Sequence, residues 1–265
     1  GPPPQGQANS SAPMVGQINE LKRIVQDDPQ NFPAFVQLGN LHFDVQMWDQ
    51  AVGYYEQALE LQPDNEQVHL HLAIALVRMG EVDQASEQLK ELLRINPESH
   101  SGRLAMARLY RETGLNQLAV EEYRKLLRQN PDLDQASLEL GLLYEELEEW
   151  QNALDVFTGV LDQRPLDFNL RHHLARVYIG MKRYDDALNE LNVIVDLKPD
   201  DFEARRKIGL IYLEQERWAD AVSVFKAILE LNPDLERTQV SLGHYLMEGP
   251  LDWEGSERAF QCAAQ

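Results

Sequence analysis

The chain has 265 residues and is acidic, with 24 Lys and Arg against 44 Asp and Glu and a formal net charge of -20. This charge repels phosphate backbones and anionic lipid surfaces, so we exclude nucleic acid as a general partner. Hydrophobic residues make up 43% of the chain but never form the run of about 18 that a membrane-spanning helix needs, and the single cysteine, Cys262, excludes an internal disulfide and a cysteine-based zinc site.

The first segment, residues 1–13, is rich in proline and lacks periodic apolar residues. Such a composition cannot bury a core, so we expect a disordered linker, part of which could be the remnant of a protease site. An upstream anchor could then precede Gly1, and the compartment stays open. We expect a soluble chain without direct membrane insertion and favour the cytoplasm.

Residues 14–30 are predicted to form one helix. Gln17, Leu21 and Ile24 fit the inner face of the second helix of a pair. The terminal repeats of a helical stack need a cover for their apolar face, so we interpret this half repeat as an N-terminal cap.

From residue 29 onward a proline returns every 34 residues. The positions are Pro29, Pro63, Pro97, Pro131, Pro165, Pro199 and Pro233. Proline lacks the N–H group and clashes with the preceding helical turn, so each one marks a break between helices. Acidic residues and Asn follow several of them, as in Pro63-Asp64-Asn65, and suit a turn before a helix start.

Two helical segments fit between successive prolines. The first carries a Gly or Ala three residues before an aromatic residue or Leu, as in Gly141 and Tyr144. The second carries a small residue, a large one four positions later and an apolar one three positions after that, as in Ala153, Phe157 and Val160. Each spacing marks one helical face, and the small residues let two backbones approach closely.

This pattern resembles the tetratricopeptide repeat (TPR) family, whose 34-residue motif is W-x2-L-G-x2-Y, then A-x3-F, then P. The resemblance extends from about residue 14 to residue 265. It implies an all-α fold, a right-handed superhelical solenoid of antiparallel helix pairs, with about six full repeats in residues 32–235 and partial repeats at both ends. Residues 236–265 form a seventh, irregular or truncated repeat, because its alignment needs an insertion near Gly249-Pro250. The leading Trp of the motif is replaced by Phe35, His69, Arg103, Ser137, Arg171, Arg205 and Gln239.

The resemblance further implies a concave surface lined by the first helix of each pair, on which protein or peptide partners bind. Basic residues and six of the seven histidines lie on these helices, whereas the rest of the chain is strongly acidic. Our candidate groove residues are Asn40, His71, Arg78, Arg108, Arg111, Glu139, Leu142, His172, Arg176, Arg206, Lys207 and Arg237. Alternating charges beside apolar pockets suit a peptide segment, including an acidic one.

One other interpretation of these charges stays open, because they could merely solvate an exposed helix face. Some family members clamp a C-terminal carboxylate, but only Asn40 matches the residues that do so, and recognition of such a tail is not supported. If the charges do form the groove, replacing Arg176 and Lys207 by Glu should weaken partner capture without lowering the melting temperature, because exposed charges contribute little to stability.

Catalysis, metal binding and cofactor binding are not predicted. No nucleophile has a base at a suitable spacing, no glycine-rich phosphate loop is present, and the adjacent His172 and His173 point to different faces of a helix. The acidic pairs Glu145-Glu146 and Glu148-Glu149 are interpreted as a solvated helix face. We expect a protein-binding scaffold, with no cofactor and no metal.

Two alternative functions belong to other classes. The chain could be the targeting or assembly arm of a larger enzyme or polysaccharide-secretion machine, which a longer gene would favour. It could also self-assemble through an unfinished C-terminal repeat, and a monomer at high concentration would argue against that.

Overall fold

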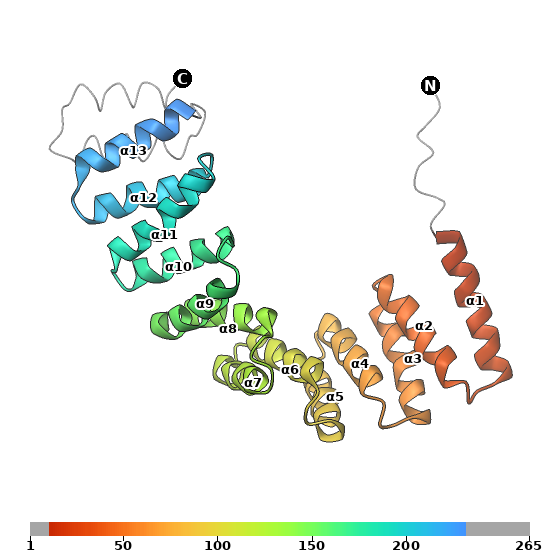
Figure 1. Cartoon of the computed structure of the whole chain (residues 1–265). Helices are drawn as coiled ribbons and strands as arrows, with labels where there is room; N and C mark the ends of the chain where they lie inside the picture. The colour runs from red at the N-terminus through yellow and green to blue at the C-terminus, as the bar shows by residue number, and fades with distance from the viewer. Residues whose placement is uncertain (1–10, 232–265) are drawn as a thin grey trace, which may run out of the picture. The chain divides into compact units, whose positions relative to one another are not determined.

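A computed structural model of the chain describes residues 11–231 (Figure 1). These residues form thirteen helices in tandem pairs and contain no strand, which confirms the predicted all-α class. The helices are α1 (Ser11–Asp27), α2 (Phe32–Asp44), α3 (Trp48–Leu61), α4 (Glu66–Met79), α5 (Val82–Ile95), α6 (His100–Glu112), α7 (Asn116–Gln129), α8 (Asp134–Glu146), α9 (Trp150–Gln163), α10 (Phe168–Gly180), α11 (Tyr184–Leu197), α12 (Phe202–Glu214) and α13 (Trp218–Leu231). The predicted seventh repeat, with Arg237, lies outside the described residues.

The helix α1 begins at Ser11, inside the segment that we expected to be disordered and ahead of the predicted start at residue 14. Pro13 therefore falls in the first turn of this helix. The N–H groups of a first turn have no acceptor within the helix, so a proline there removes no hydrogen bond.

The first helix of most pairs starts at a side-chain cap two residues after the repeating proline. Asn31, Asn65, Ser99, Asp167 and Asp201 each accept a hydrogen bond from the backbone N–H three residues later. Such a cap satisfies one of the N–H groups that a helix start leaves without a partner. Proline thus ends one pair, and the cap begins the next.

The turn inside each pair is also built the same way every time. One residue adopts a positive φ, and the following N–H donates back to a carbonyl in the last turn of the first helix, as Met47 N donates to His42 O at 2.9 Å. The positive-φ residues recur every 34 positions, at Gln46, Gly80, Gly114, Glu148, Lys182 and Glu216. This left-handed residue ends the helix and reverses the chain.

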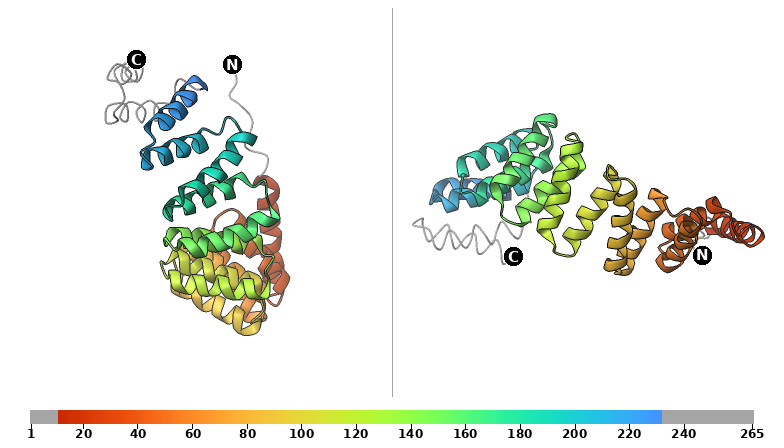
Figure 2. Two further views of the ribbon diagram at one scale, coloured as in Figure 1. Left: turned by 60° about the vertical axis from the view of Figure 1, so that its left-hand side comes forward. Right: turned by 90° about the horizontal axis from the view of Figure 1, so that it is seen from below.

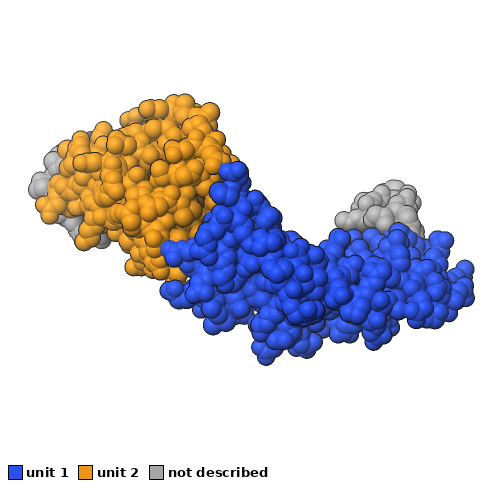
Figure 3. All heavy atoms as spheres, turned by 60° about the horizontal axis from the view of Figure 1, so that its bottom comes forward, with its two compact units in different colours: residues 1–136 blue, residues 137–265 orange. Residues whose placement is uncertain are grey.

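The helices group into two compact units, residues 1–136 and residues 137–265 (Figure 3). In unit 1, α1 packs on α2 through Leu21 against Ala34 and Leu38, and α2–α3, α4–α5 and α6–α7 form the pairs. The second helix of one pair contacts the first helix of the next, so α3 meets α4 and α5 meets α6. One continuous core therefore runs through these pairs, and it includes Tyr55 and Leu89.

Unit 2 repeats the same scheme. Helices α10–α11 and α12–α13 form pairs, and α9 contacts α10 while α11 contacts α12. Leu191, Ile194 and Ile208 lie in the core between α11 and α12, and Phe225 fills the last hairpin. Figure 2 shows the helix pairs from two further directions.

Candidate functional site

Unit 1 contains a pocket of about 140 Å³ between the first helices α4 and α6. Its volume is roughly ten times the ~10–15 Å³ that admits one water molecule. The lining residues are Ala73, Ile74, Val77, Arg78, Leu89, Ala105, Arg108, Leu109 and Glu112. Apolar side chains of α4, α5 and α6 form most of the wall. The small side chain of Ala105, half-buried on α6, leaves room for a guest.

Charged side chains form the polar part of this pocket. Arg78 is exposed and makes no ion pair with any described residue, while Arg108 is half-buried and Glu112 is exposed. Arg78 and Arg108 belong to the predicted groove, so the structure brings two predicted cations to one apolar pocket. The other predicted residues of unit 1, including Arg111, are not among its lining residues.

Asn40 and His71 are engaged inside the fold. The hydroxyl of Tyr55 donates to Asn40 Oδ1 at 2.8 Å, so that oxygen is already occupied. His71 is half-buried, with its ring centroid 6.3 Å from that of Phe43 and 5.8 Å from that of Tyr55. Burial lowers the pKa of His71, although the nearby Asp44 carboxylate opposes the shift. This histidine is therefore neutral at pH 7.

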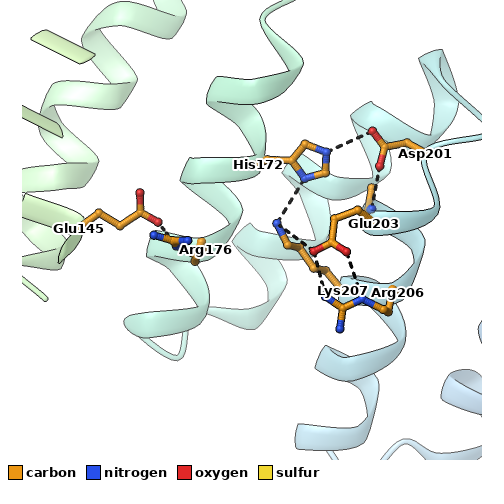
Figure 4. Close-up of polar contacts among 8 residues, drawn as sticks. Glu145, His172, Arg176, Asp201, Glu203, Arg206 and Lys207 are labelled. Atoms are coloured by element: carbon orange, nitrogen blue, oxygen red, sulfur yellow. Dashed lines mark hydrogen bonds and ion pairs between the residues drawn. The ribbon is translucent and has the colours of Figure 1, made fainter. Parts of the chain in front are cut away.

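Unit 2 holds a buried carboxylate that the sequence did not reveal (Figure 4). The side chain of Glu145 is 0% exposed, and it accepts hydrogen bonds from His173 Nδ1 at 2.8 Å and from Arg176 Nε. Figure 4 shows the contact with Arg176. Both donors lie on α10, whereas Glu145 lies in the last turn of α8. Our interpretation of Glu145 as part of a solvated acidic face is wrong, because a carboxylate can be buried when charged or polar donors satisfy it.

A second polar group joins α10 to α12. His172 Nε2 donates to Asp201 Oδ2 at 3.2 Å, and Lys207 Nζ lies 3.4 Å from His172 Nδ1 (Figure 4). An ammonium group can only donate, so Nδ1 accepts and the histidine proton sits on Nε2. The neighbouring histidines His172 and His173 thus reach in opposite directions, toward α12 and toward α8.

Two of these groups have shifted pKa values. Burial lowers the pKa of Lys207, and the nearby Arg176 and Arg206 add to this effect while Glu203 opposes it. Burial alone would raise the pKa of Asp201, but hydrogen bonds from the Ala204 N–H and from His172 outweigh it, so its pKa is lowered. Asp201 is consequently held as a carboxylate.

The predicted basic residues of unit 2 are therefore joined to acids. Arg176 pairs with Glu145, and Arg206 and Lys207 both approach Glu203, at 2.9 and 3.8 Å. This pairing changes our expectation for the charge reversal at Arg176 and Lys207, because a Glu at position 176 would face a buried carboxylate and lower stability. Glu139 and Leu142 are half-buried on α8.

Family comparisons agree with this architecture. Three family models, each described as Tetratricopeptide repeat, match residues 43–109 with 144–211, residues 104–168, and residues 204–238. The first of them alone covers just over half of the chain. The chain belongs to the tetratricopeptide repeat family. TPR arrays are helical scaffolds for protein interaction, and this chain has their fold.

Solved TPR structures resemble the chain in fold. A tetratricopeptide repeat protein from Parabacteroides merdae is 20% identical, with a TM-score of 0.58 over 88% of this chain and 92% of that one. YrrB, described as a TPR protein with an unusual peptide-binding site, is 18% identical, with a TM-score of 0.58 over 71% of this chain and 96% of that one. The C-terminal part of a TPR protein from Cytophaga hutchinsonii is 13% identical, with a TM-score of 0.71 over 86% and 93%. No curated protein matches the sequence significantly.

The structure explains why this TPR chain lacks the leading Trp of the motif. Four residues at the position of the Trp donate to the carbonyl of the proline six residues earlier, at 2.6 to 2.8 Å. They are His69, Arg103, Arg171 and Arg205. Arg103 and Arg171 also pair with an acid on the second helix of the same repeat, as Arg103 does with Glu122 at 2.9 Å. These side chains link the turn to the hairpin at the position of the motif's Trp.

The part of the TPR array that the structure describes contains neither a helix able to span a membrane nor a cluster of metal ligands. None of the helices within residues 11–231 combines the length and the apolarity that a membrane crossing requires. Those same residues hold no group of three or more His, Cys, Asp or Glu side chains placed to bind a metal ion.

Proposed function

We propose that the chain is a scaffold that captures a peptide segment of a partner protein on the first helices of unit 1. The observation that carries the proposal is the pocket between α4 and α6, which combines an apolar wall with Arg78 and Arg108. An aliphatic side chain of the peptide would occupy the apolar part. A carboxylate beside it would pair with Arg78, because exposed charges at a binding surface select complementary partners.

Several features support an acidic segment as the guest. Arg78 has no acidic partner among the described residues, and it lies on a chain whose net charge is -20, so a cation here is a local exception. YrrB shares the fold and has a peptide-binding site. The proposal needs no catalytic residue. No observation on residues 11–231 favours the targeting-arm or self-assembly alternatives.

Peptide display on the whole chain tests this proposal. We expect the wild-type chain to enrich peptides in which an aliphatic residue neighbours Asp or Glu. Ala105→Trp, which fills the pocket, should abolish this enrichment, and Arg78→Glu should remove the preference for acidic peptides while retaining the aliphatic residue. Arg128→Glu makes the same change of charge on an exposed site of the second helix α7 and should leave the enriched peptides unchanged. Identical peptides from the wild type and Ala105→Trp would contradict the proposal.

We also propose that α1 is the half-repeat cover of the first hairpin. Leu21 is 7% exposed and packs against Ala34 and Leu38, as a second helix packs on the next pair. Leu21→Asp should therefore lower the melting temperature, whereas a change at the exposed Val15 on the same helix should not.

A further inference from the structure

Three consecutive turns of unit 1 expose pairs of apolar side chains. These six residues, which we call the apolar edge, are Val45, Met47, Met79, Val82, Leu115 and Leu118. Their exposed fractions range from 37% for Val82 to 50% for Leu115. Single exposed apolar residues are common on proteins, but here two occur at or beside each of three successive turns, in a row along the array.

The row lies along one side of unit 1. Each pair lies at or next to the α2–α3, α4–α5 or α6–α7 turn: Met79 ends α4, Val82 begins α5 and Leu118 lies in the first turn of α7. The first helices of successive repeats run in the same direction, so their C-terminal ends point to one edge. None of the six residues lines the pocket between α4 and α6, so the apolar edge is a separate surface.

The fold itself does not require apolar residues at these turns. In unit 2 the corresponding turns have the same positive-φ residue and the same backbone hydrogen bond, with Glu149 N donating to Tyr144 O and Arg183 N to Tyr178 O, both at 2.8 Å. At the position of Met47 and Leu115 their side chains are charged, namely Glu149, Arg183 and Arg217. Arg183 and Arg217, for example, lie over the rings of Tyr178 and Tyr212. Leu147 and Met181 stand at the positions of Val45 and Met79 but are half-buried, so among the described residues only the unit 1 turns carry large apolar side chains that are exposed.

Acidic residues surround the apolar edge. Those exposed beside the three turns are Asp44, Asp49, Glu81, Asp83, Glu112 and Glu121, against the two cations Arg78 and Arg111. A second copy of the chain would bring the same acids to this edge, and an anionic membrane would be repelled by them. The charge complementarity favours a partner that carries both apolar and basic side chains.

We propose that the apolar edge is a docking surface for a basic amphipathic helix of a partner protein. Neighbouring repeats place their turns roughly 10 Å apart, since packed helices lie 8–10 Å from one another. Seven residues of an α-helix span about 10.5 Å, so each heptad of the bound partner helix matches the distance between neighbouring repeats. A pair of apolar residues per heptad then meets a pair at each turn, and flanking Lys or Arg residues face the acids.

The test uses the whole chain and a fluorescein-labelled helical peptide of Leu and Lys in heptad register. We expect binding in a fluorescence anisotropy titration, at least tenfold weaker for the triple variant Met47→Ser, Met79→Ser, Leu115→Ser. The control variant Leu166→Ser, Leu197→Ser removes apolar side chains that are 67% and 53% exposed away from these turns, and it should bind like the wild type. A matched peptide with Glu in place of Lys should not bind.

Three outcomes would overturn the proposal. The triple variant could bind the Leu–Lys peptide as tightly as the wild type while retaining its circular dichroism spectrum and melting temperature. The Glu peptide could bind equally well, which would remove the charge complementarity. Light scattering could instead show a wild-type dimer that the triple variant dissociates, in which case the occupant is a second copy. A failure of Ala105→Trp in peptide display would leave this result intact, because that variant changes neither a residue of the apolar edge nor one of the acids beside it.

Discussion

Gly141 on α8 lies directly beneath the ring of Phe157 on α9. A Cβ atom at position 141 would come within 2.4 Å of Phe157 Cε1, which is closer than two carbon atoms can approach. Gly39 has the same relationship to Tyr55, and Gly209 to Phe225. At the equivalent positions Ala73 shares a core with the smaller Leu89 and Ala175 with Leu191, which balances the volume of the two partners, whereas α6–α7 combines Ala107 with Tyr123.

We expect Gly141→Ala to destabilise the chain by about 1–3 kcal/mol, because overpacking a dense core forces its side chains off their preferred rotamers. Adding Phe157→Leu should restore much of that loss, since Ala175 with Leu191 is the combination in the next repeat. Chemical denaturation of the two single variants and the double variant measures this coupling. Additive single effects would contradict the proposed balance.

The buried carboxylate of Glu145 gives a second prediction. Arg176→Ala should lower the free energy of unfolding by about 1–3 kcal/mol, because it leaves one oxygen of a buried charged group without its donor. Arg206→Ala is the control, since Arg206 pairs with the exposed Glu203 and such pairs contribute up to about 1 kcal/mol. Urea denaturation compares the two. Equal effects would mean that Glu145 does not depend on Arg176.

Asp201 connects the cap of α12 to His172 and predicts a dependence on pH. Asp201→Ala should cost about 1 kcal/mol through loss of the cap, whereas Asp201→Asn keeps a capping oxygen and loses only the charge. The pKa of Asp201 is lowered, so its charge stabilises the fold above the unfolded pKa of about 3.9. The stability difference between the wild type and Asp201→Asn should therefore shrink as pH falls from 6 to 3. A constant difference would exclude the charge as its cause.

Left-handed turn residues give a fourth prediction. Gln46 has a φ of 61°, which strains any side chain, so Gln46→Gly should stabilise the chain by up to about 1 kcal/mol. The same substitution inside helix α3, Gln57→Gly, should instead destabilise the chain by about 0.5–1 kcal/mol. Gly80→Ala, at a φ of 82°, should also destabilise. Thermal unfolding of the three variants shows whether each substitution raises or lowers the melting temperature.

The sequence predicted the fold well because proline and the small residues act locally. The break after Pro63 and the face that contains Ala153 and Phe157 depend on backbone chemistry and helical spacing, which are visible in one repeat at a time. The predicted start of α1, at residue 14, was three residues too late, because a proline is tolerated in a first helical turn.

The candidate site was less predictable, because it depends on contacts between repeats. Glu145, His173 and Arg176 lie about one repeat apart in the sequence, and nothing local distinguishes a buried Glu from a solvated one. Asp201 did carry a signal, its place two residues after Pro199, but that position indicated only a helix cap. The side chains of Ile74 and Ala105 meet around the pocket only after α4 and α6 have packed.

The recurring caps and left-handed turns make each hairpin an exchangeable module. Removal of residues 66–99 would join the cap Asn65 directly to α6, where it replaces Ser99, and every glycine would keep its own ring partner. A gene duplication or loss of one such period therefore preserves the cap and the turn at the junction, while the packing between repeats, such as Leu92 against Gly102, changes. Lineages could lengthen or shorten this protein to suit the size of what it holds.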